Sequence, residues 1–559
     1  MPTLQFKGKT FVQNHHLAVK YHQLVPQKKL SLTDKVSLHD NLIIQGDNLK
    51  ALKALLPNYA GRVDCVYIDP PYNTGKEEWK YNDNVNSPMM QEWFGKIVDK
   101  EDLTRHDKWL CMMMPRLKLL RELLSEEGII VVHIDDNEIH SLRFLMDEIF
   151  NRENFTCNFI WKTDGNFDNQ AKIKICHEYV VVYSKNIEEF EAPSIIDPNT
   201  SEDSKLYKDQ IRNTIVKNGS KNPKSILKLT KGFPANFEQG VIKKRRDSWP
   251  YYKGDAIIED YKLVNEVEIE SGWSSKELFE EFVNSGMKPV RDNKNQESRF
   301  EIISSGAIEV VKQRSEDQSH VLSVLMNMGN TQSMSSALSE IGIDFDYPKP
   351  ISLSKYLLKL INKKDAIIID SFAGSGTTAH AVLELNKEDG GNRKFILVEQ
   401  EEYADAITAE RVRRVIKGVK TAKDESLKNG LGGSFSFFQL GHPIEMESLL
   451  RGKNLPSFTE FARYLFYTAT GEEFDEKAIN EKTGFIGKSS NYDVFLYYKP
   501  ELEWLKTHAL TLDKLNELPK HKGKMRLVFA PAKYVDDHTL AEYRVDFCQL
   551  PYEIYRLQK

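Results

Sequence analysis

The tetrapeptide Asp69-Pro70-Pro71-Tyr72 places a carboxylate, two prolines and an aromatic ring directly after an apolar run, residues 63–68. Two successive prolines fix φ and remove two backbone donors, so the Pro70 carbonyl and the Asp69 carboxylate can face one direction as acceptors. Two fixed acceptors beside a stacking ring suit chemistry on the exocyclic amine of a nucleobase. The alternative is an ordinary turn that leaves a strand. The strand context and the aromatic ring favour the functional interpretation.

A second candidate site is the glycine-rich segment 370–378, which also follows a predicted strand. Gly374 and Gly376 permit close approach of a ligand to the backbone, and the helix that follows offers unpaired N–H groups to a carboxylate or phosphate. Glu399 closes the next predicted strand, where it could bind a ribose diol. The spacing predicts a nucleoside-cofactor site. A dinucleotide site or a structural turn are alternatives, although Ala379 stands where a dinucleotide motif requires its third glycine.

Both segments lie within a pattern of alternating strands and helices. The pattern covers residues 41–150, is lost between about 155 and 330, and resumes over 351–416. Such alternation predicts an α/β domain with a largely parallel sheet, here interrupted by an insert. The carboxyl ends of parallel strands are where open α/β sheets bind their ligands. The two candidate sites therefore belong to one domain.

Composition excludes several classes of protein. The 559 residues carry a net charge of −5, so a nucleic-acid surface must be local; residues 205–253 hold 13 Lys and Arg against 3 Asp and Glu. Five scattered cysteines without a CxxC pair argue against a disulfide framework and against a zinc cluster, and we expect no metal. The strongest apolar run, 128–134, is too short to span a bilayer. We expect a cytoplasmic protein without a membrane segment.

Together, Asp69-Pro-Pro-Tyr72 and Phe372-Ala-Gly-Ser-Gly376 resemble motifs IV and I of amino-group DNA methyltransferases, in the circularly permuted order of the β group. The chain resembles in particular the modification subunit of type III restriction-modification systems, and residues 109–119, 128–138 and 347–350 extend the similarity. The resemblance implies a Rossmann-like S-adenosylmethionine-dependent methyltransferase fold with a mixed, mostly parallel sheet. The implied organisation is an N-terminal arm (1–35), a catalytic half (36–154), an inserted target-recognition domain (155–330), a cofactor-binding half (331–427) and a small α+β C-terminal interaction domain (428–559).

The resemblance also implies a reaction, the methylation of adenine N6 in double-stranded DNA. The adenine is flipped out of the duplex, Tyr72 stacks on it, and Asp69 and the Pro70 carbonyl orient N6 toward the sulfonium methyl of the cofactor. Asp rather than Ser or Asn at the first motif position favours adenine over cytosine N4. The residues implied to bind S-adenosylmethionine are Asp47, Asn48, Lys349, Pro350, Ser352, Asp370, Phe372, Ala373, Gly374, Ser375, Gly376, Glu399 and Gln400.

In the insert, a basic and aromatic segment is the candidate DNA contact, with a solvated charged face as the alternative. Its residues are Lys243, Lys244, Arg245, Arg246, Trp249 and Tyr251. Expected partners are double-stranded DNA, a second copy in a homodimer, and a separate restriction subunit with helicase and endonuclease functions. A catalytically silent specificity subunit and a cytosine-N4 or RNA methyltransferase are the competing hypotheses. His133, Asp135 and Asp136 could form an acid/base cluster, but a capped strand end explains them as well.

Overall fold

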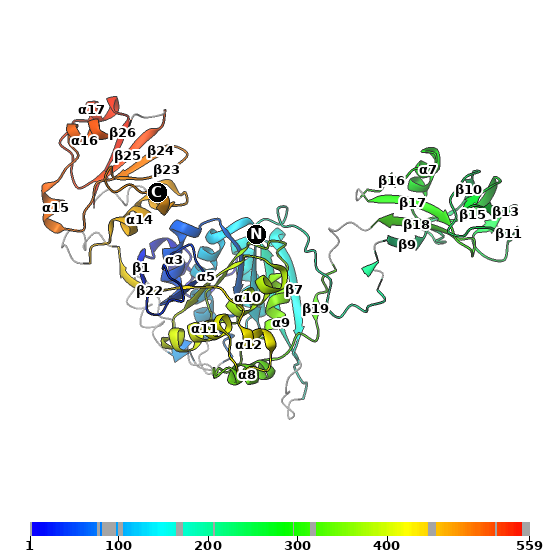
Figure 1. Cartoon of the computed structure of the whole chain (residues 1–559), viewed down its shortest axis with the longest axis horizontal. Helices are drawn as coiled ribbons and strands as arrows, with labels where there is room; N and C mark the ends of the chain where they lie inside the picture. Colours follow the sequence, from blue (N-terminus) through cyan, green and yellow to red (C-terminus); the bar gives the residue numbers. More distant parts are fainter. Residues whose placement is uncertain are drawn as a thin grey trace. The chain divides into compact units, whose positions relative to one another are not determined.

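The computed structural model describes residues 3–74, 79–80, 97–98, 104–163, 172–204, 207–208, 210–293, 296–313, 320–444, 454–519 and 523–550. The chain divides into two compact units (Figure 1). The larger unit contains Met1–Glu191 and Leu322–Lys559, and the smaller contains Ala192–Val321. The larger unit is thus interrupted by the smaller one, as the break in the α/β pattern predicts.

The larger unit is built on a ten-stranded sheet with the order β1-β22-β2-β21-β20-β3-β6-β8-β7-β19. The six strands from β22 to β6 run parallel, β8 is antiparallel to both of its neighbours, and β1 is antiparallel to β22. The predicted mixed, mostly parallel α/β sheet is confirmed. Its strands are β1 (His22–Pro26), β2 (Leu42–Gln45), β3 (Val63–Ile68), β6 (Leu124–Ile134), β7 (Phe155–Lys162), β8 (His177–Ser184), β19 (Val324–Leu325), β20 (Ile367–Asp370), β21 (Lys394–Glu399) and β22 (Ser436–Pro443).

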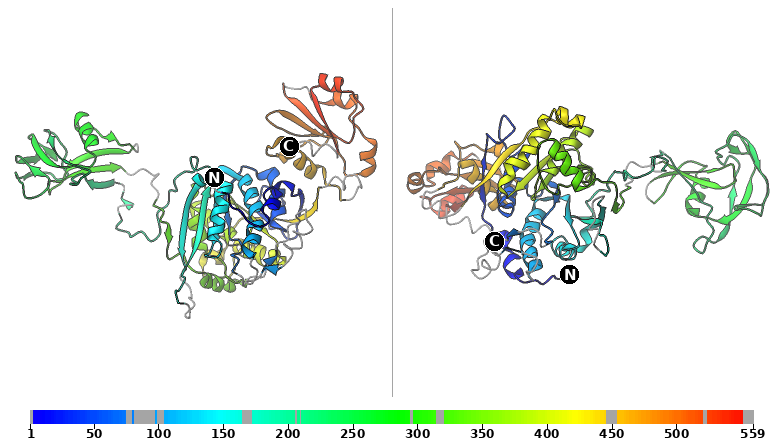
Figure 2. Two further views of the ribbon diagram at one scale, coloured as in Figure 1. Left: turned by 180° about the vertical axis from the view of Figure 1, so that it is seen from behind. Right: turned by 90° about the horizontal axis from the view of Figure 1, so that it is seen from below.

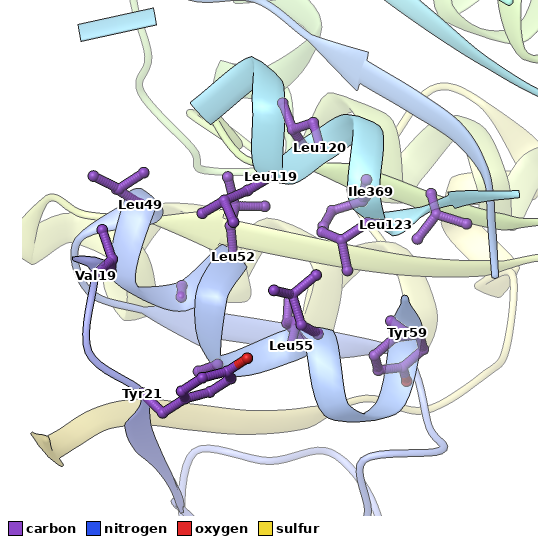
Figure 3. Packing of buried hydrophobic residues seen from close by; sticks show 14 of the residues in the cluster. Val19, Tyr21, Leu49, Leu52, Leu55, Tyr59, Leu119, Leu120, Leu123 and Ile369 are labelled. Atoms are coloured by element: carbon purple, nitrogen blue, oxygen red, sulfur yellow. The ribbon is translucent and has the colours of Figure 1, made fainter. Parts of the chain in front are cut away.

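Helices cover the sheet because its central strands are apolar on both faces. On one face α3 packs against α5, and Figure 3 shows Leu52 and Leu55 of α3 facing leucines of α5. On the other face α9, α10 and α11 pack together (Figure 2). The helices of this unit are α1 (Lys9–Val12), α2 (His15–Ala18), α3 (Asn48–Tyr59), α5 (Arg105–Leu123), α6 (Ile139–Phe150), α8 (Thr331–Glu340), α9 (Ile351–Leu358), α10 (Thr377–Asp389), α11 (Glu410–Lys417), α12 (Glu425–Asn429), the 3-10 turns η1 (Arg152–Asn154) and η3 (Glu402–Ala404), and the π-helical turn η4 (Asp405–Ala409).

Two predicted boundaries differ from the structure. Strands β7, β8 and β19 lie within the predicted insert 155–330 but complete the main sheet, so the separate unit is the shorter segment Ala192–Val321. The reason is the fully buried run 180–182, whose apolar side chains require the sheet. The predicted N-terminal arm, 1–35, is also integrated, since α1 and α2 contact α5 and β1 pairs with β22.

In its described residues the smaller unit contains three sheets, ordered β10-β15-β12, β11-β13-β14 and β16-β17-β18-β9, and one helix, α7 (Lys276–Asn284). It has its own apolar core around Phe233, Phe279, Phe282 and Phe300. Its strands are β9 (Gln210–Thr214), β10 (Lys224–Leu229), β11 (Gly240–Ile242), β12 (Tyr251–Tyr252), β13 (Ala256–Glu259), β14 (Lys262–Leu263), β15 (Val267–Gly272), β16 (Val290–Arg291), β17 (Glu297–Ile302) and β18 (Ile308–Gln313).

The C-terminal region begins with β22 in the main sheet, and α14 (Phe458–Thr470) then packs on α3. A four-stranded sheet follows, in which β23 is antiparallel to β24 while β24, β25 and β26 run parallel with helices between them. These connections make the region α/β, where the sequence predicted α+β. Its remaining elements are η5 (Glu476–Ala478), β23 (Phe485–Lys488), β24 (Tyr492–Leu496), α15 (Leu502–Thr507), α16 (Leu512–Glu517), β25 (Met525–Ala530), α17 (Asp537–Glu542) and β26 (Val545–Gln549).

A separate two-stranded sheet, formed by β4 (Trp79–Lys80) and β5 (Ile97–Val98), comes between β3 and α5 in the sequence.

Candidate active site

The two sequence motifs meet where the strand order of the sheet reverses, between the parallel neighbours β3 and β20. Strands β3 and β20 are parallel neighbours, but the chain continues from β3 to β6 on one side and from β20 to β21 on the other. Ligands of open α/β sheets bind outside the carboxyl ends of strands at such a switch point. Asp69 directly follows β3 and Asp370 ends β20. The fold therefore brings the catalytic and cofactor candidates together.

Asp69 is held by a lysine from the other half of the domain. The Nζ atom of Lys349 lies 2.9 Å from Oδ2 of Asp69, and the Lys349 side chain is only 9% exposed. Burial is the largest single influence on Asp69 and disfavours its ionised form, but the Lys349 ammonium together with hydrogen bonds from Lys349 and Tyr72 holds the pKa of Asp69 below its ordinary value. Asp69 is therefore an ionised acceptor at neutral pH. Lys349, a predicted cofactor residue, is placed instead against the predicted catalytic carboxylate.

The remainder of the tetrapeptide is fixed by neighbouring side chains. The indole Nε1 of Trp109, on α5, donates a hydrogen bond to the Pro71 carbonyl at 2.7 Å. The role of the Pro70 carbonyl as an acceptor for the amino group stays a prediction. The hydroxyl of Tyr72 donates to Oε2 of Glu178 on β8 at 2.9 Å. Glu178 is a site residue that the sequence analysis missed.

The turn that follows the motif depends on a second buried carboxylate. Asn73 has a left-handed backbone (φ 59°), and its Nδ2 donates to Oε1 of Glu138 at 2.5 Å. Nδ1 of His106 lies 2.6 Å from the same oxygen. Glu138 is fully buried, so these contacts compensate for its desolvation. Neither Glu138 nor Asn73 was singled out from sequence, since Glu138 follows Asp135, Asp136 and Asn137 in a polar junction where no local pattern distinguishes it.

His133 has a structural rather than an acid/base environment. Its Nε2 lies 2.8 Å from the hydroxyl of Tyr67, which also lies 2.9 Å from Oγ of Ser354 on α9. Burial lowers the pKa of His133 to about 3, so the ring is neutral at physiological pH. Asp135 accepts a hydrogen bond from the backbone N–H of Asn137, as a capping residue does. These contacts favour the capped strand end over an acid/base cluster.

The glycine turn is stabilised from the neighbouring strand. Gly374 and Gly376 have left-handed backbones, with φ of 49° and 81°. The carboxylate of Glu399, at the end of β21, accepts from the N–H of Gly374 at 2.7 Å and from the N–H of Glu401 at 3.0 Å. Burial raises the pKa of Glu399 above its ordinary value. Glu399 therefore shapes the turn, and its predicted contact with a ribose remains a prediction.

Other predicted cofactor residues of this turn make internal contacts. Oδ1 of Asp370 accepts from the N–H of Phe372 at 3.0 Å, and burial raises the pKa of Asp370 to about 7. The Ser375 hydroxyl is buried and accepts from Nη1 of Arg411 on α11 at 2.7 Å. The Ser375 side chain thus supports the turn from behind rather than facing a ligand. Ala373, also buried, donates its N–H to the Val398 carbonyl at 3.1 Å.

Asp47 and Asn48 lie at the carboxyl end of β2. Asp47 caps α3 by accepting from the N–H of Lys50 at 3.0 Å, and the preceding residue, Gly46, donates its N–H to the Glu399 carbonyl. Asn48 is buried; its amide donates to the Ser371 carbonyl at 3.1 Å and accepts from Nε of Arg116 at 2.6 Å. A cavity of about 390 Å³ opens here, lined by His22, Gln45, Gly46, Asp47, Lys50, Gln439, Leu440 and Gly441. Asp47, but not Asn48, is available to a ligand.

The remaining cofactor candidates lie at the start of α9 and after the end of β21. Pro350 is the N-cap of α9. Ser352 donates through its hydroxyl to the Met328 carbonyl at 2.6 Å. Gln400 follows β21 and is exposed. Within the described parts of the chain, no cluster of three or more His, Cys, Asp or Glu side chains has the arrangement of a metal site.

The DNA-binding candidates gather on the smaller unit. The rings of Trp249 and Tyr251 stack with centroids 3.7 Å apart, and Nζ of Lys224 lies 4.7 Å from the Trp249 ring. Lys243 pairs with Asp255 at 3.0 Å. Lys244 and Arg246 are exposed, whereas Arg245 is half-buried and its Nε donates to the Pro250 carbonyl at 3.2 Å. Arg245 is thus better placed to hold the strand β12 than to bind DNA.

Comparison with known proteins identifies the family. A family profile described as DNA methylase matches residues 63–410, which include both motifs and the switch point. The chain belongs to the DNA methylase family. It is 32% identical to the EcoPI Mod subunit, a type III restriction-modification enzyme of Escherichia phage P1, over 70% of this chain and 64% of that protein. The StyLTI Mod subunit of Salmonella typhimurium is 28% identical, with coverage of 79% and 66%.

The alignment covers a larger share of a type II relative than of the two type III relatives. The type II methyltransferase M.KpnI of Klebsiella pneumoniae is 29% identical over 66% of this chain and 82% of its own length. By contrast, this methylase spans slightly less than two thirds of the length of the two type III relatives. Among solved structures, the PvuII DNA methyltransferase (cytosine-N4-specific) aligns over 67% of this chain and 90% of its own, with 12% identity and a TM-score of 0.29. At that TM-score the alignment does not bear on the assignment.

In the described parts of this methylase, every helix is too short or too polar to cross a membrane.

Proposed function

We propose that this methylase transfers a methyl group from S-adenosylmethionine to N6 of adenine in double-stranded DNA. The observation that carries the proposal is the junction of Asp69-Pro70-Pro71-Tyr72 with the Gly374–Gly376 turn at one switch point of the sheet. One side supplies acceptors for an exocyclic amine and a stacking ring. The other supplies a backbone turn that a nucleoside cofactor can approach. Membership of the DNA methylase family supports the same reaction class.

The residues on the cofactor side fit a nucleoside with an amino-acid tail. Gly374 and Gly376 contribute no side chains to the turn, and the start of α10 at Thr377 presents N–H groups to a carboxylate. The cavity beside Asp47 is of small-molecule size and offers polar groups. Glu399 contacts both the glycine turn and the wall of the cavity. Its carboxylate accepts from the N–H of Gly374 in the turn, and its backbone carbonyl accepts from the N–H of Gly46 at the cavity. When bound, S-adenosylmethionine would supply the electrophilic methyl group.

The protein's own contribution is mainly positioning. Asp69 is ionised and its carboxylate is oriented by Lys349, so it can accept a hydrogen bond from an amino group. The Pro70 carbonyl offers a second acceptor in the same rigid segment. Two acceptors on one exocyclic amine direct its nitrogen lone pair out of conjugation with the ring, which makes the nitrogen a better nucleophile. Tyr72 supplies the face on which a base flipped out of the duplex would stack.

We further propose that the chain acts as the modification and specificity subunit of a type III restriction-modification system. The support is its similarity to the EcoPI and StyLTI Mod subunits. In this role the smaller unit, Ala192–Val321, reads the DNA sequence, and the partners are double-stranded DNA, a second copy of the chain and a separate restriction subunit. The proposed location is the cytoplasm.

The first experiment incubates the full chain with duplex DNA and methyl-labelled S-adenosylmethionine. The DNA is then digested and the labelled nucleoside identified by mass, with Asp69→Ala as the control. Label in N6-methyl-deoxyadenosine that disappears in the variant is the expected result. Label on cytosine would overturn the assignment of the base, and absence of label from wild type with intact cofactor binding would favour the silent specificity subunit.

A further inference from the structure

Glu178 connects the stacking ring to the cation that holds the catalytic carboxylate. Its Oε2 accepts from the Tyr72 hydroxyl at 2.9 Å and lies 3.4 Å from Nζ of Lys349. The same Nζ pairs with Asp69 at 2.9 Å and lies 4.9 Å from the Tyr72 ring centroid. Four side chains from three segments of the larger unit thus form one polar cluster.

We propose that Glu178 is a positioning residue for the target base, which fixes the Tyr72 ring and restrains Lys349 so that the Asp69 carboxylate stays available to the amino group. This inference rests on the proposed methyl transfer to a base. It assigns to Glu178 no contact with the base itself.

The charge arrangement is the first reason for this assignment. One ammonium lies between two carboxylates, and each restrains its position. Without Glu178, Lys349 would interact with Asp69 alone and would compete more strongly with an incoming amino group for the Asp69 lone pairs. The Glu178 side chain is 22% exposed and that of Lys349 only 9%, so water screens this competition weakly.

The rigidity of the scaffold is the second reason. Glu178 lies opposite Trp161 in the antiparallel pairing of β8 with β7. Trp161 is fully buried, and its ring lies 6.0 Å from Nζ of Lys349. The backbone of Glu178 is therefore held by a packed strand pair. The hydrogen bond that the Tyr72 hydroxyl donates to this fixed acceptor restricts rotation of the Tyr72 ring, and a stacking surface requires a fixed ring.

The test compares Glu178→Gln with a matched control, Glu188→Gln, which removes the same charge from an exposed position just beyond β8. Methylated DNA is sequenced to locate the target, and 2-aminopurine at that position then reports base capture by its fluorescence. For Glu178→Gln we expect kcat to fall roughly 10- to 100-fold and the fluorescence increase to diminish, since the ion pair with Lys349 is lost and the Tyr72 hydroxyl keeps only a neutral amide oxygen as its acceptor. The Kd for S-adenosylmethionine and the Tm should stay at wild-type values, as should every property of Glu188→Gln.

A double-mutant cycle with Tyr72→Phe identifies the route of the effect. Tyr72→Phe keeps the ring and removes only the hydroxyl, so it should also lower kcat, and the double variant should lose less than the product of the two single losses. Strictly multiplicative losses, or a Glu178→Gln enzyme that matches wild type, would overturn the inference while leaving the proposed function intact. A wild-type chain that methylates no DNA would instead refute the proposed function. If Glu178→Gln does not fold, a wild-type rate for Tyr72→Phe is sufficient to reject the inference.

Discussion

The indole N–H of Trp109 donates a hydrogen bond of 2.7 Å to the carbonyl of Pro71. Trp109 is fully buried in α5, a helix packed between α3 and α6. The carbonyl of Pro71 is therefore tied to the core of the larger unit. This bond orients the tetrapeptide that carries the proposed acceptors, Asp69 and the Pro70 carbonyl.

Replacement of Trp109 by Phe should reduce both stability and turnover. The variant retains most of the apolar contact but leaves the Pro71 carbonyl unpaired, which costs roughly 1–3 kcal/mol. We expect a lower urea midpoint and a decrease in kcat larger than any change in the Kd for S-adenosylmethionine. Trp504, a half-buried tryptophan of α15 whose ring stacks on that of His508, provides the control substitution Trp504→Phe. Equal turnover in the two variants would contradict a role for the Pro71 contact.

Asp69→Asn and Asp69→Ala should both abolish detectable methyl transfer while S-adenosylmethionine still binds. Asparagine preserves the volume but removes the charge that Lys349 pairs with. Calorimetric titration with the cofactor and transfer of labelled methyl groups measure the two properties separately. Loss of cofactor binding in both variants would show that the catalytic and cofactor halves have been misassigned.

Glu399→Gln should weaken cofactor binding about tenfold, which corresponds to the loss of roughly one hydrogen bond to a charged acceptor. The carboxylate accepts from the N–H groups of Gly374 and Glu401, and an amide can accept with only one of its two heavy atoms. Glu401→Gln, at an exposed neighbouring position, is the matched control. Calorimetry that finds equal affinities for the two variants would count against Glu399 as a support of the cofactor turn.

Stability should fall as the pH is lowered from about 6.5 toward 3, in part because of His133. Burial lowers the folded-state pKa of His133 to about 3, whereas an unfolded histidine titrates near 6.5. Between these values the unfolded state binds more protons, so acid favours unfolding; at pH 5 the contribution is about 2 kcal/mol. His133→Gln should show a smaller loss of stability between pH 7 and pH 5 in denaturant titrations. His16 and His380, whose pKa values are also lowered by burial, remain in both proteins.

Within the smaller unit, exposed and half-buried basic residues should behave differently. Lys244→Ala and Arg246→Ala should weaken DNA binding and reduce its dependence on salt, because each removes a charge that can neutralise a phosphate. Arg245→Ala should mainly lower stability, since Arg245 bonds the Pro250 carbonyl and lies 5.3 Å from the Tyr252 ring. Fluorescence anisotropy at several salt concentrations, alongside thermal unfolding, separates the two effects. An unchanged salt slope in both exposed variants would argue for a merely solvated face.

Local sequence was sufficient to find the two motifs and their supporting strands. Proline restricts its own backbone and glycine accepts positive φ, so Pro70, Pro71, Gly374 and Gly376 impose their conformations without help from distant residues. The insert was also visible, but its borders were not. A buried apolar strand such as β8 has the same sequence pattern whichever sheet it joins. Only its pairing with β6 and β7 assigns β8 to the larger unit.

Sequence alone therefore determined the class of the sheet, the order of the two halves and the candidate residues on which the proposed chemistry rests. The tertiary structure decided which side chains meet those residues: Lys349 against Asp69, Glu178 against Tyr72, and Trp109 against Pro71. Each pair joins segments far apart in the chain, and their approach depends on strand order and helix packing rather than on local spacing. Motifs reflect backbone preferences within a few residues, whereas the environment that orients a carboxylate and sets its pKa arises only when distant elements pack together.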